Sequence, residues 1–505
     1  MREIGEARPE YGSIQERSGE FVGMTGKKIQ RARTKTVATV GPASNSPEQL
    51  NQLIQCGVDV FRINTAHGTA DEHDQIFHAI RAASEQQGRP VAILVDLAGP
   101  KIRLGSLFTE TVDCPVGRQF RFVRNEVRAA DELTCSYDRL IDELSVDNQV
   151  MLADGSVTMV VESVTQDQAT CRVISGGAIR SRQGVNLPGV ALSLSAVTEK
   201  DKERARWAAS VGADFVSQSF VRNAEEIIAL KSMLTESGSD AAVIAKIEKR
   251  EALEALEPIV EAADGVMVAR GDLGVEIDVA ETPVAQKRII RVCQRLCKPV
   301  IVATQMLESM HDSRRPTRAE ASDVANAILD GTDAVMLSNE TAVGDFPVEA
   351  VQTMATIACR IEKDYPQRSV DSHLASTVPN ALSGAVSTIA SQLNASAILP
   401  LTKSGATAKN VSKFRPAAPI LAITPDPTVA CRLQLVWGVK PLVIPQHERT
   451  THTFLAAMTQ AKTMGLLKEG DLVVQTAGTH TGVSGSTDLV KVGIVSSEEA
   501  PVNMI

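Results

Sequence analysis

The sequence predicts an α/β protein built around a (β/α)8 TIM barrel, with a small β-rich domain inserted into the barrel and an open-sheet α/β domain after it. Three observations indicate this. Apolar runs alternate with amphipathic stretches from about residue 33, residues of different character interrupt them, and a second α/β pattern begins after residue 370. The predicted domains are an N-terminal arm (1–32), a barrel in two parts (33–104 and 184–368), an inserted domain (105–183) and a C-terminal domain (369–505).

Eight apolar runs make up the predicted barrel. They are rich in Val, Ile and Ala, which is typical of parallel strands buried on both faces. Eight such strands joined by helices predict a closed barrel. The runs are Thr36–Val40, Val58–Ile63, Val91–Asp96, Asp214–Phe220, Ala242–Ile247, Gly265–Ala269, Val300–Thr304 and Ala334–Leu337.

The helices between the runs have recognisable ends. Thr317 and Glu320 are spaced as in a capping box, ahead of a helical apolar pattern. Gly331 then provides a residue that can end the helix in a left-handed conformation. We therefore expect a helix that begins after Thr317 and ends before Gly331.

The third and fourth runs are too far apart in the sequence to be joined by one loop and one helix. The residues between them contain short β-rich segments and turn residues such as Asp154-Gly155, which predict a small inserted β domain. Such a domain could act as a lid over the barrel. Its predicted strands are Phe120–Val123, Val150–Leu152, Thr158–Val161 and Ala169–Ile174.

The C-terminal region repeats the strand–helix alternation with fewer strands. It therefore predicts a separate open sheet. The predicted strands are Ala397–Leu401, Ile420–Thr424, Leu442–Ile444 and Leu472–Gln475.

Composition excludes several classes of protein. A net charge of −9 over 505 residues argues against general nucleic-acid binding. No apolar run reaches about 18 residues, so we expect no membrane span, and the first 30 residues lack the apolar region of a signal peptide. Eight scattered cysteines without a C-x-x-C pair indicate reduced thiols and a cytoplasmic location.

Polar side chains end nearly all the barrel runs. Catalytic groups of barrel enzymes lie at the carboxyl ends of the strands, so these residues are candidates for an active site. A structural network of salt bridges is the alternative explanation. The residues are Arg62, Asn64, Asp96, Ser217, Ser219, Lys246, Glu248, Arg270, Asp272, Thr304, Gln305, Ser338 and Glu340.

Three of these residues predict a specific chemistry. Lys246 and Glu248 are two residues apart at the end of one strand, so their side chains point to the same side. Asp272 follows the next strand. Two carboxylates bind a hard divalent cation, and a nearby ammonium can neutralise a phosphate. The group therefore has the outline of a phosphoryl-transfer site.

Six longer motifs lie within the two parts of the predicted barrel. They are Thr34–Ser44, Asn186–Gly189, Ala245–Glu248, Val268–Glu276, Ala303–Met310 and Arg315–Asn326. With these motifs, the sequence resembles the pyruvate kinase family over residues 33–365 and, more weakly, to its end. The resemblance implies a barrel, an inserted lid and a C-terminal regulatory domain, in agreement with the pattern of runs. It also implies a homotetramer.

The resemblance implies phosphoryl transfer from phosphoenolpyruvate to ADP, followed by protonation of the enolate to pyruvate. Glu248 and Asp272 would hold Mg²⁺ or Mn²⁺. Lys246 and Arg62 would bind the transferring phosphoryl group. The Gly271 and Asp272 backbone would bind the substrate carboxylate, whereas Thr304 and Ser338 would order the protonating water.

Other matches lie near the implied nucleotide phosphates. They are Asn64, His67 and Arg103, although His67 could equally be a hydrogen-bonding residue at a helix start. In the lid, Gln183 occupies a position where the family commonly has a lysine. Either the neighbouring Arg182 replaces that charge, or ADP binds more weakly.

The implied monovalent-cation site departs from the family pattern. Asn64 and Asp96 match two K⁺ ligands, but Ala66 and Leu97 stand where the pattern has Ser and Thr. Lys101 stands where K⁺-dependent members have Glu. Its ammonium can substitute for K⁺, so we expect catalysis that does not require K⁺. A surface lysine without a role is the alternative.

A strand end followed by hydroxyls, a glycine and a helix start is found in the C-terminal domain. This pattern can bind phosphate, although it also suits a plain helix cap. By resemblance, the site would take a sugar-phosphate or AMP effector, since Ala477–Gly482 lacks the Trp of members that bind fructose bisphosphate. The residues are Thr402, Ser404, Gly405, Ala406 and Thr407.

Two other functions compete with an active kinase. Gln183 favours a catalytically weak regulatory subunit that binds phosphorylated metabolites. A different Mg²⁺-enolate barrel, such as an oxo-acid lyase, would need neither the inserted lid nor Arg103.

Overall fold

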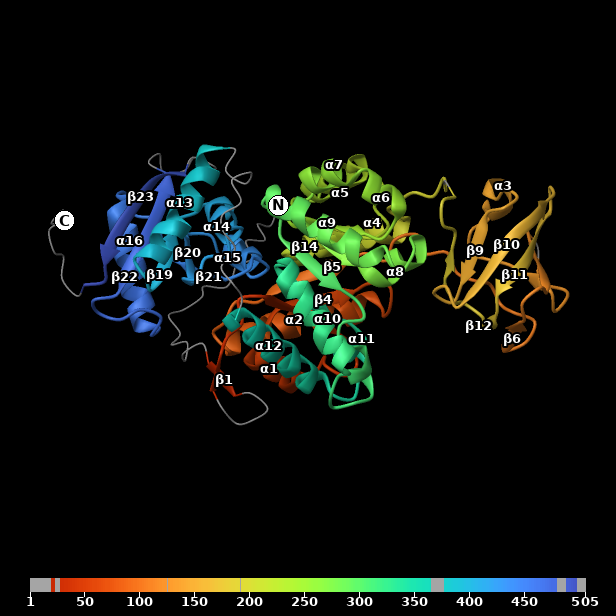
Figure 1. The fold of residues 1–505 in the computed structure, drawn as a ribbon, viewed down its shortest axis with the longest axis horizontal. Coiled ribbons are helices and arrows are strands. Elements are labelled where there is room, and N and C mark those ends of the chain that lie inside the picture. The colour runs from red at the N-terminus through yellow and green to blue at the C-terminus, as the bar shows by residue number, and fades with distance from the viewer. Residues whose placement is uncertain are drawn as a thin grey trace, which may run out of the picture.

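The computed structural model describes residues 20–22, 28–124, 126–190, 192–364, 377–478 and 487–496. The C-terminal domain, the barrel and the inserted domain follow one another along the long axis of the molecule (Figure 1). Within the predicted N-terminal arm, strands β1 (Glu20–Val22) and β2 (Lys28–Gln30) form an antiparallel pair. Most other residues of the arm lie outside the described residues.

The predicted (β/α)8 barrel is confirmed. Eight parallel strands close in the order β14-β15-β16-β17-β18-β3-β4-β5. Each of the eight predicted runs overlaps one of these strands, with ends that differ by at most two residues. They are β3 (Lys35–Val40), β4 (Val58–Asn64), β5 (Ala92–Asp96), β14 (Phe215–Gln218), β15 (Ala242–Ile247), β16 (Gly265–Ala269), β17 (Val300–Ala303) and β18 (Ala334–Leu337).

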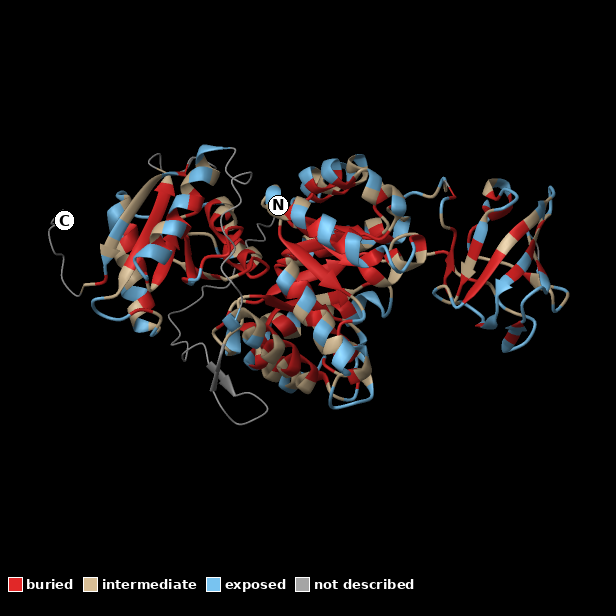
Figure 2. Cartoon of the chain, in the orientation of Figure 1, coloured by how far each residue is buried: buried red, intermediate tan, exposed pale blue. Residues whose placement is uncertain are grey.

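The barrel strands lack an alternating pattern because both of their faces are buried (Figure 2). Val60, Ile244 and Met336 belong to the cluster inside the barrel, whereas Val95 and Val268 pack outwards with the helices. Leu435 of the C-terminal domain also belongs to the inner cluster and is 1% exposed. A residue from another domain therefore completes the core of the barrel.

The helix predicted between Thr317 and Gly331 begins and ends where the sequence predicts. Thr317 accepts from the Glu320 backbone N–H in a complete capping box, and Gly331 ends that helix at φ 94°. The helices are α1 (Pro47–Cys56), α2 (Ala70–Gln86), α4 (Glu199–Val211), α5 (Ala224–Glu236), α6 (Arg250–Glu254), α7 (Leu256–Ala262), α8 (Arg270–Glu276), α9 (Thr282–Arg295), α10 (Arg318–Asp330), α11 (Asn339–Ala342) and α12 (Pro347–Asp364), with a 3-10 turn at Glu308–His311.

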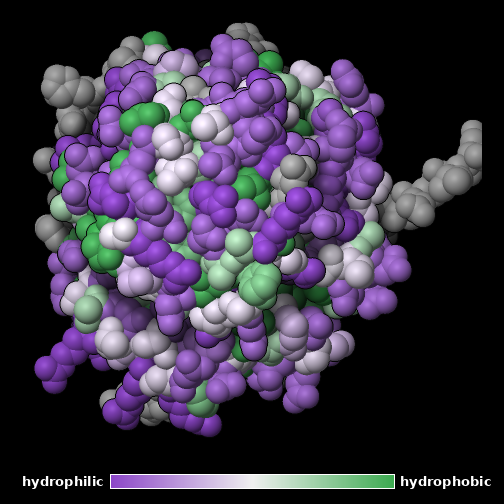
Figure 3. Space-filling model, turned by 90° about the vertical axis from the view of Figure 1, so that its right-hand side faces the viewer, coloured by the Kyte–Doolittle hydropathy of each residue, from purple (hydrophilic) through white to green (hydrophobic). Residues whose placement is uncertain are grey.

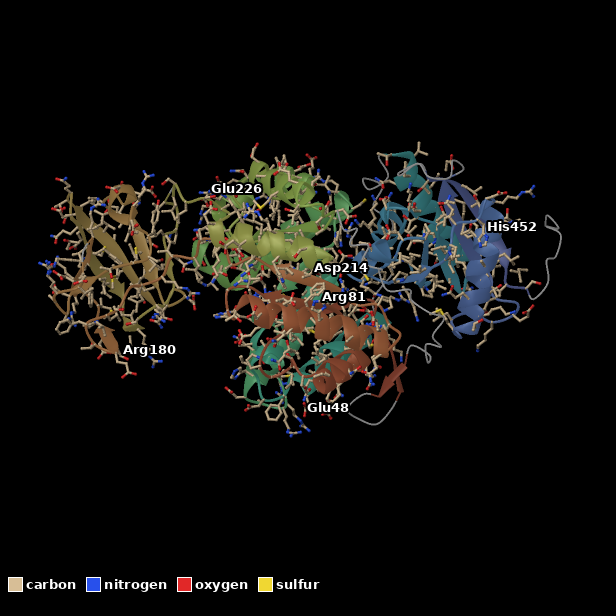
Figure 4. The ribbon with its side chains drawn as sticks, turned by 180° about the vertical axis from the view of Figure 1, so that it is seen from behind. Glu48, Arg81, Arg180, Asp214, Glu226 and His452 are labelled. Atoms are coloured by element: carbon tan, nitrogen blue, oxygen red, sulfur yellow. The ribbon has the colours of Figure 1, made fainter. Side chains whose placement is uncertain are left out.

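Ion pairs join the helical layer to the strands. Arg81 of α2 lies beside Asp214, the residue before β14 (Figure 4), with 2.8 Å between Nη2 and Oδ2. Asp214 Oδ2 also accepts a hydrogen bond from the backbone N–H of Ile93 in β5, at 2.7 Å. One carboxylate thereby ties a helix to a barrel strand.

The inserted domain contains a six-stranded sheet in the order β13-β9-β10-β11-β7-β8 and a separate pair, β12-β6. Its four predicted strands are present, but four others were not predicted: β6, β8, β12 and β13. The elements are β6 (Thr111–Cys114), β7 (Gln119–Val123), β8 (Glu132–Leu133), α3 (Leu140–Glu143), β9 (Gln149–Leu152), β10 (Val157–Val164), β11 (Gln168–Ser175), β12 (Gly177–Arg180) and β13 (Val185–Asn186).

The C-terminal domain is an open five-stranded sheet in the order β21-β20-β19-β22-β23, with only β23 antiparallel. The four predicted strands are present, and β23 was not predicted. The elements are α13 (Val378–Gln392), β19 (Ala397–Pro400), α14 (Ala406–Ser412), β20 (Ile420–Thr424), α15 (Pro427–Leu433), β21 (Val439–Val443), α16 (Thr450–Thr463), β22 (Leu472–Gly478) and β23 (Thr487–Ile494).

Buried polar contacts join the C-terminal domain to the amino end of the barrel. Arg415 Nη1 lies 3.0 Å from Asp333 Oδ1, and Arg415 Nη2 donates to the Gly331 carbonyl at 2.6 Å. Lys35 Nζ, at the start of β3, donates to the Val439 carbonyl at 2.7 Å. These contacts fix the orientation of the C-terminal domain relative to the barrel.

The buried Lys35 gives a prediction about pH. Burial lowers the pKa of Lys35 from 10.5 to about 8, against the opposing charge of Asp59. Below pH 8 the Lys35 side chain is charged in both the folded and the unfolded chain. Burying this charge lowers the free energy of unfolding by about 3 kcal/mol. Between pH 8 and 10.5 the unfolded chain binds the extra proton, so this cost diminishes and stability rises with pH.

We therefore expect Lys35→Met to raise the free energy of unfolding at pH 7. The expected gain is about 1–2 kcal/mol, since the hydrogen bond to Val439 is lost. The gain should shrink near pH 9.5, as measured by urea denaturation at both pH values. Lys363→Met, at an exposed position of α12, is the control. A gain that is equal at the two pH values would contradict the assignment.

The surface at the end of the molecule that carries the inserted domain is mainly hydrophilic, with scattered hydrophobic side chains (Figure 3). Phe108, Val116 and Val146 are exposed in this domain. Within the described ranges, no helix is long and apolar enough to cross a membrane. All eight cysteines lie in the described ranges, and none of them forms a disulfide bond there.

Candidate active site

The candidate catalytic side chains gather at one mouth of the barrel. Arg62 lies near the end of β4, Lys246 lies in β15, and Thr304 follows β17. Since the strands are parallel, their carboxyl ends meet on one side. The chain leaves for the inserted domain from the end of β5 on this same side, so that domain flanks the mouth (Figure 1).

Asp96 is the centre of the polar network at the mouth. Arg62 Nη2 and Nε lie 2.6 and 2.8 Å from Asp96 Oδ2, and Ser217 Oγ donates to Oδ1 at 2.6 Å. Burial alone would raise the pKa of Asp96, but the charges of Lys246 and Arg62 outweigh it and hold the pKa below its usual value. Asp96 is therefore an anion that orients two cations.

Lys246 is a buried ammonium with three oxygen neighbours. Its Nζ donates to Ser219 Oγ at 2.7 Å and lies 3.0 Å from Glu248 Oε1 and 3.5 Å from Asp96 Oδ1. Burial would lower the pKa of Lys246, but the Asp96 and Glu248 carboxylates raise it above its usual value. Lys246 is thus a permanent cation, suited to meet charge on a phosphoryl group.

Glu248 and Asp272 fit a divalent cation. Glu248 Oε2 accepts the Phe220 N–H at 2.7 Å, whereas Oε1 is buried and lies 3.0 Å from Lys246 Nζ. Burial raises the pKa of Glu248 despite the ammonium of Lys246, and the charge of Asp272 adds to the rise. A divalent cation between Glu248 and Asp272 would relieve the repulsion between these two carboxylates.

The described residues contain no cluster of three or more His, Cys, Asp or Glu side chains arranged for a metal. Two protein carboxylates with the remaining positions left to substrate and water are typical of Mg²⁺ sites in phosphoryl-transfer enzymes. The donor set thus favours a hard ion such as Mg²⁺ or Mn²⁺ rather than zinc.

Thr304 lies on a strained turn, with φ 68° at Thr304 and 54° at Gln305. Arg270 holds this turn, because its Nη2 donates to the Thr304 carbonyl at 2.7 Å while its Nη1 lies 2.7 Å from Asp323 Oδ2. The Gly271 N–H donates to Thr304 Oγ1 at 2.8 Å, so in this structure that N–H is engaged within the protein. The turn therefore places the Thr304 hydroxyl beside the start of α8.

Ser338 follows β18, and its Oγ is buried without a hydrogen-bond partner in the part of the chain that the structure describes. The Ser338 backbone N–H donates to Glu340 Oε2 at 2.6 Å, which fixes the main chain there. A buried hydroxyl without a protein partner is available to a water molecule.

The four candidate nucleotide residues lie on two separate segments. Asn64 Oδ1 accepts the Ala66 N–H at 3.1 Å, and His67 is exposed with its carbonyl 2.7 Å from His73 Nε2. Arg103 and Arg182 lie on the two segments that connect the barrel to the lid, and Arg103 Nη1 donates to the Arg182 carbonyl at 3.3 Å. Among described residues, no hydrogen bond or ion pair joins the two segments.

Gln183 has a structural contact within the lid. Its side-chain Oε1 accepts the Arg180 N–H at 2.6 Å. The neighbouring Arg182 is exposed and adopts φ 66°. Arg182 is therefore the cation available next to Gln183.

Lys101 lies against the candidate metal carboxylates. Its Nζ is 3.3 Å from Asp272 Oδ1, and the two side chains are 32% and 26% exposed. The resemblance implied a position near Asn64 and Asp96, but Asp96 is already paired with Arg62 and Lys246. The structure thus places the extra positive charge on the Asp272 side of the mouth.

The candidate effector loop lies between β19 and α14. Gly405 begins α14 at φ 84° without a side-chain cap, and Thr407 Oγ1 lies 3.0 Å from Thr487 Oγ1 of β23. Thr402 is buried, and its N–H donates to the Ile423 carbonyl at 2.8 Å. Ser404 is exposed and Ala406 half-buried. Residues 479–482 of the second candidate segment lie outside the described residues.

Several residues that complete the site were not singled out from the sequence. Thr39 accepts Arg62 Nη1 at 3.0 Å, and Asp323 anchors Arg270. Thr39 and Asp323 both lie within the motifs that carry the family resemblance. Membership of these motifs is the signal that could have indicated a role for them.

The fold and the mouth together define a class of protein: a (β/α)8 barrel enzyme whose carboxylate pair and buried ammonium suit metal-assisted phosphoryl transfer. A family model described as the pyruvate kinase barrel domain matches residues 31–351, and one described as the pyruvate kinase alpha/beta domain matches residues 380–493. The chain belongs to the pyruvate kinase family, and it is a phosphotransferase.

Relatives with this name are similar over most of the chain. Pyruvate kinase 2 of Synechocystis sp. is 50% identical over 470 residues, which are 92% of this chain and 80% of that protein. The pyruvate kinase of Geobacillus stearothermophilus is 43% identical over 92% of this chain and 81% of that protein. That of Bacillus licheniformis is 41% identical over 92% of this chain and 80% of that protein.

Proposed function

We propose that this chain transfers the phosphoryl group of phosphoenolpyruvate to ADP with Mg²⁺ and without K⁺, giving pyruvate and ATP. The observation that carries the proposal is the buried Lys246 ammonium beside Glu248 at the barrel mouth. A bound Mg²⁺ or Mn²⁺ would act as a Lewis acid on the phosphoryl and enolate oxygens, held by Glu248 and Asp272.

The protein groups have separate parts in the reaction. Lys246 and Arg62 neutralise the phosphoryl group as its bond to the enol oxygen breaks and a bond to the terminal oxygen of ADP forms. The electron pair of the broken bond becomes the enolate. Thr304 and Ser338 hold the water that delivers a proton to the methylene carbon. The backbone at Gly271 and Asp272 receives the substrate carboxylate, for which the Gly271 N–H exchanges its hydrogen bond to Thr304 Oγ1.

The nucleotide is bound from both segments that flank the mouth. Asn64 and His67 on the barrel, with Arg103 and Arg182 on the lid, would surround its phosphates when the lid closes. Arg182 carries the charge that Gln183 lacks. A catalytically weak regulatory subunit is the second candidate, favoured by the engagement of Gln183 with Arg180 inside the lid.

A coupled assay for pyruvate decides between these functions. Activity should appear with phosphoenolpyruvate, ADP and Mg²⁺ in a buffer free of K⁺ and Na⁺, and a chelator should abolish it. An absolute need for added K⁺ would remove the proposal that Lys101 replaces that ion. Absence of pyruvate with every cation would favour the regulatory subunit.

The C-terminal loop from Thr402 to Thr407 would bind a phosphorylated activator, either a sugar monophosphate or AMP. Its exposed Ser404 hydroxyl and the uncapped start of α14 support this assignment. We further propose a homotetramer in the cytoplasm, as the family resemblance implies.

The effector site can be tested by thermal shift. Hexose or pentose monophosphates or AMP should raise the melting temperature of the wild type. Ser404→Ala with Thr407→Val should weaken the apparent affinity about 10-fold or more, because hydrogen bonds to a charged phosphate are lost. Thr463→Ala in α16 is the control. No shift with any of these compounds would remove the assignment.

A further inference from the structure

Two lysines form ion pairs with side chains on one face of α8, the helix that carries the candidate metal ligand Asp272. Asp272 and Glu276 are four residues apart on this helix, so their side chains lie on the same face. Lys101 contacts Asp272, and Lys249 contacts Glu276. The two lysines also line one cavity at the base of the lid.

The Lys249–Glu276 pair is the more buried of the two. Lys249 Nζ lies 2.5 Å from Glu276 Oε1, with the side chains 14% and 1% exposed. Glu276 Oε2 is buried and has no hydrogen-bond partner in the described ranges. A buried pair that leaves one oxygen unsatisfied is a poor source of stability, since apolar residues in its place are often as stable or more so. Its position in the site is more informative.

Lys249 directly follows Glu248 at the end of β15, and Glu276 is one helical turn after Asp272. Each member of the pair is therefore close in the chain to one of the two candidate metal ligands. Lys249 is the next residue after Glu248, and Glu276 lies in the same short helix as Asp272. The next strand, β16, separates these ligands in sequence, and β15 and β16 are paired only up to Ile247 and Val268. The ion pair joins the two segments beyond the point where the sheet holds them.

We infer that the Lys249–Glu276 ion pair is a positioning device that sets the separation of Glu248 and Asp272 for a divalent cation. This inference rests on the proposed metal site. Mg²⁺ requires nearly ideal octahedral geometry with short bonds, so a small change in the separation of its two carboxylates weakens binding.

The test uses Mn²⁺ alone as the probe, with its affinity measured by the electron paramagnetic resonance signal of the free ion. The decisive variant is Lys249→Met with Glu276→Gln, which removes both buried charges and leaves neither unpaired. We expect its Mn²⁺ dissociation constant to rise about 10-fold, the lower end of the range for groups that support metal ligands.

Two further measurements separate positioning from general stability. In the assay the double variant should show a raised apparent KM for Mg²⁺ while kcat at saturating Mg²⁺ changes less than threefold. The single variant Lys249→Arg keeps the positive charge, so it should retain most of the Mn²⁺ affinity of the wild type. Lys231→Met is the matched control, because Lys231 pairs with Asp264 at 2.8 Å at the opposite, amino end of β16.

The outcomes are distinct. An unchanged Mn²⁺ affinity in the double variant, or an equal loss in Lys231→Met, overturns the inference. If the double variant does not fold, Lys249→Arg and Glu276→Gln decide it separately, and unchanged Mn²⁺ affinity in Glu276→Gln overturns it. If the wild type does not bind Mn²⁺ at all, the proposed metal site fails as well.

Discussion

Lys246→Met is expected to lower kcat for pyruvate formation by about 10²–10³-fold, the loss typical of removing one preorganised charge from a reacting centre. Methionine keeps most of the side-chain volume, so the change removes mainly the ammonium. In the structure that ammonium is held by Ser219, Glu248 and Asp96. The measurement is steady-state kinetics at saturating phosphoenolpyruvate, ADP and Mg²⁺.

The variant must be shown to be folded, because removing Lys246 leaves the Glu248 carboxylate buried without its counter-charge. A loss of about 3–5 kcal/mol in stability is expected from such an unpaired charge. Circular dichroism at the assay temperature controls for this. Lys202→Met, on the surface of α4, should be fully active. Phosphoryl transfer at the wild-type rate in folded Lys246→Met would disprove the proposed mechanism.

Lys101→Glu is expected to lower activity about 10²-fold in a buffer without K⁺ and Na⁺. The substitution replaces an ammonium 3.3 Å from Asp272 by a third carboxylate near Glu248 and Asp272. Like charges at such distances raise the energy of the anionic site. Added K⁺ should recover part of the loss by supplying the missing positive charge. The measurement is kcat as a function of K⁺ concentration for the variant and the wild type.

Lys101→Met separates the loss of a positive charge from the gain of a negative one, and it should be affected less than Lys101→Glu. Full activity of Lys101→Glu without K⁺ would show that Lys101 has no role. A loss of activity that K⁺ does not change would retain an electrostatic role for Lys101 but reject its replacement of the monovalent ion.

The barrel and the central strands of both other domains could be predicted because their sequences are long enough to carry a pattern. The eight runs show apolar residues on both strand faces, and the capping box at Thr317 fixes a helix start. Strands such as β8 (Glu132–Leu133) and β13 (Val185–Asn186) are two residues long, so no period can be recognised. β23 pairs at a sheet edge, where exposure weakens the apolar pattern.

The site could be predicted only in part, for a related reason. Parallel strands bring their carboxyl ends together, so the gathering of Lys246, Glu248 and Asp96 follows from the strand ends alone. The choice of partners does not. Lys101 meets Asp272, 171 positions later, and Arg270 holds Thr304 in a left-handed conformation. These contacts depend on loop geometry, which has no periodic signal in the sequence.

Leu435 makes the barrel depend on the C-terminal domain for a complete core. It closes the amino end of the barrel from the C-terminal domain, while the candidate active site lies at the carboxyl end. Cutting the chain between the domains would therefore open the barrel interior to solvent, rather than release two independent parts. A shift of the C-terminal domain would also press directly on the inner strand residues. The core of the barrel is thus shared between the two domains.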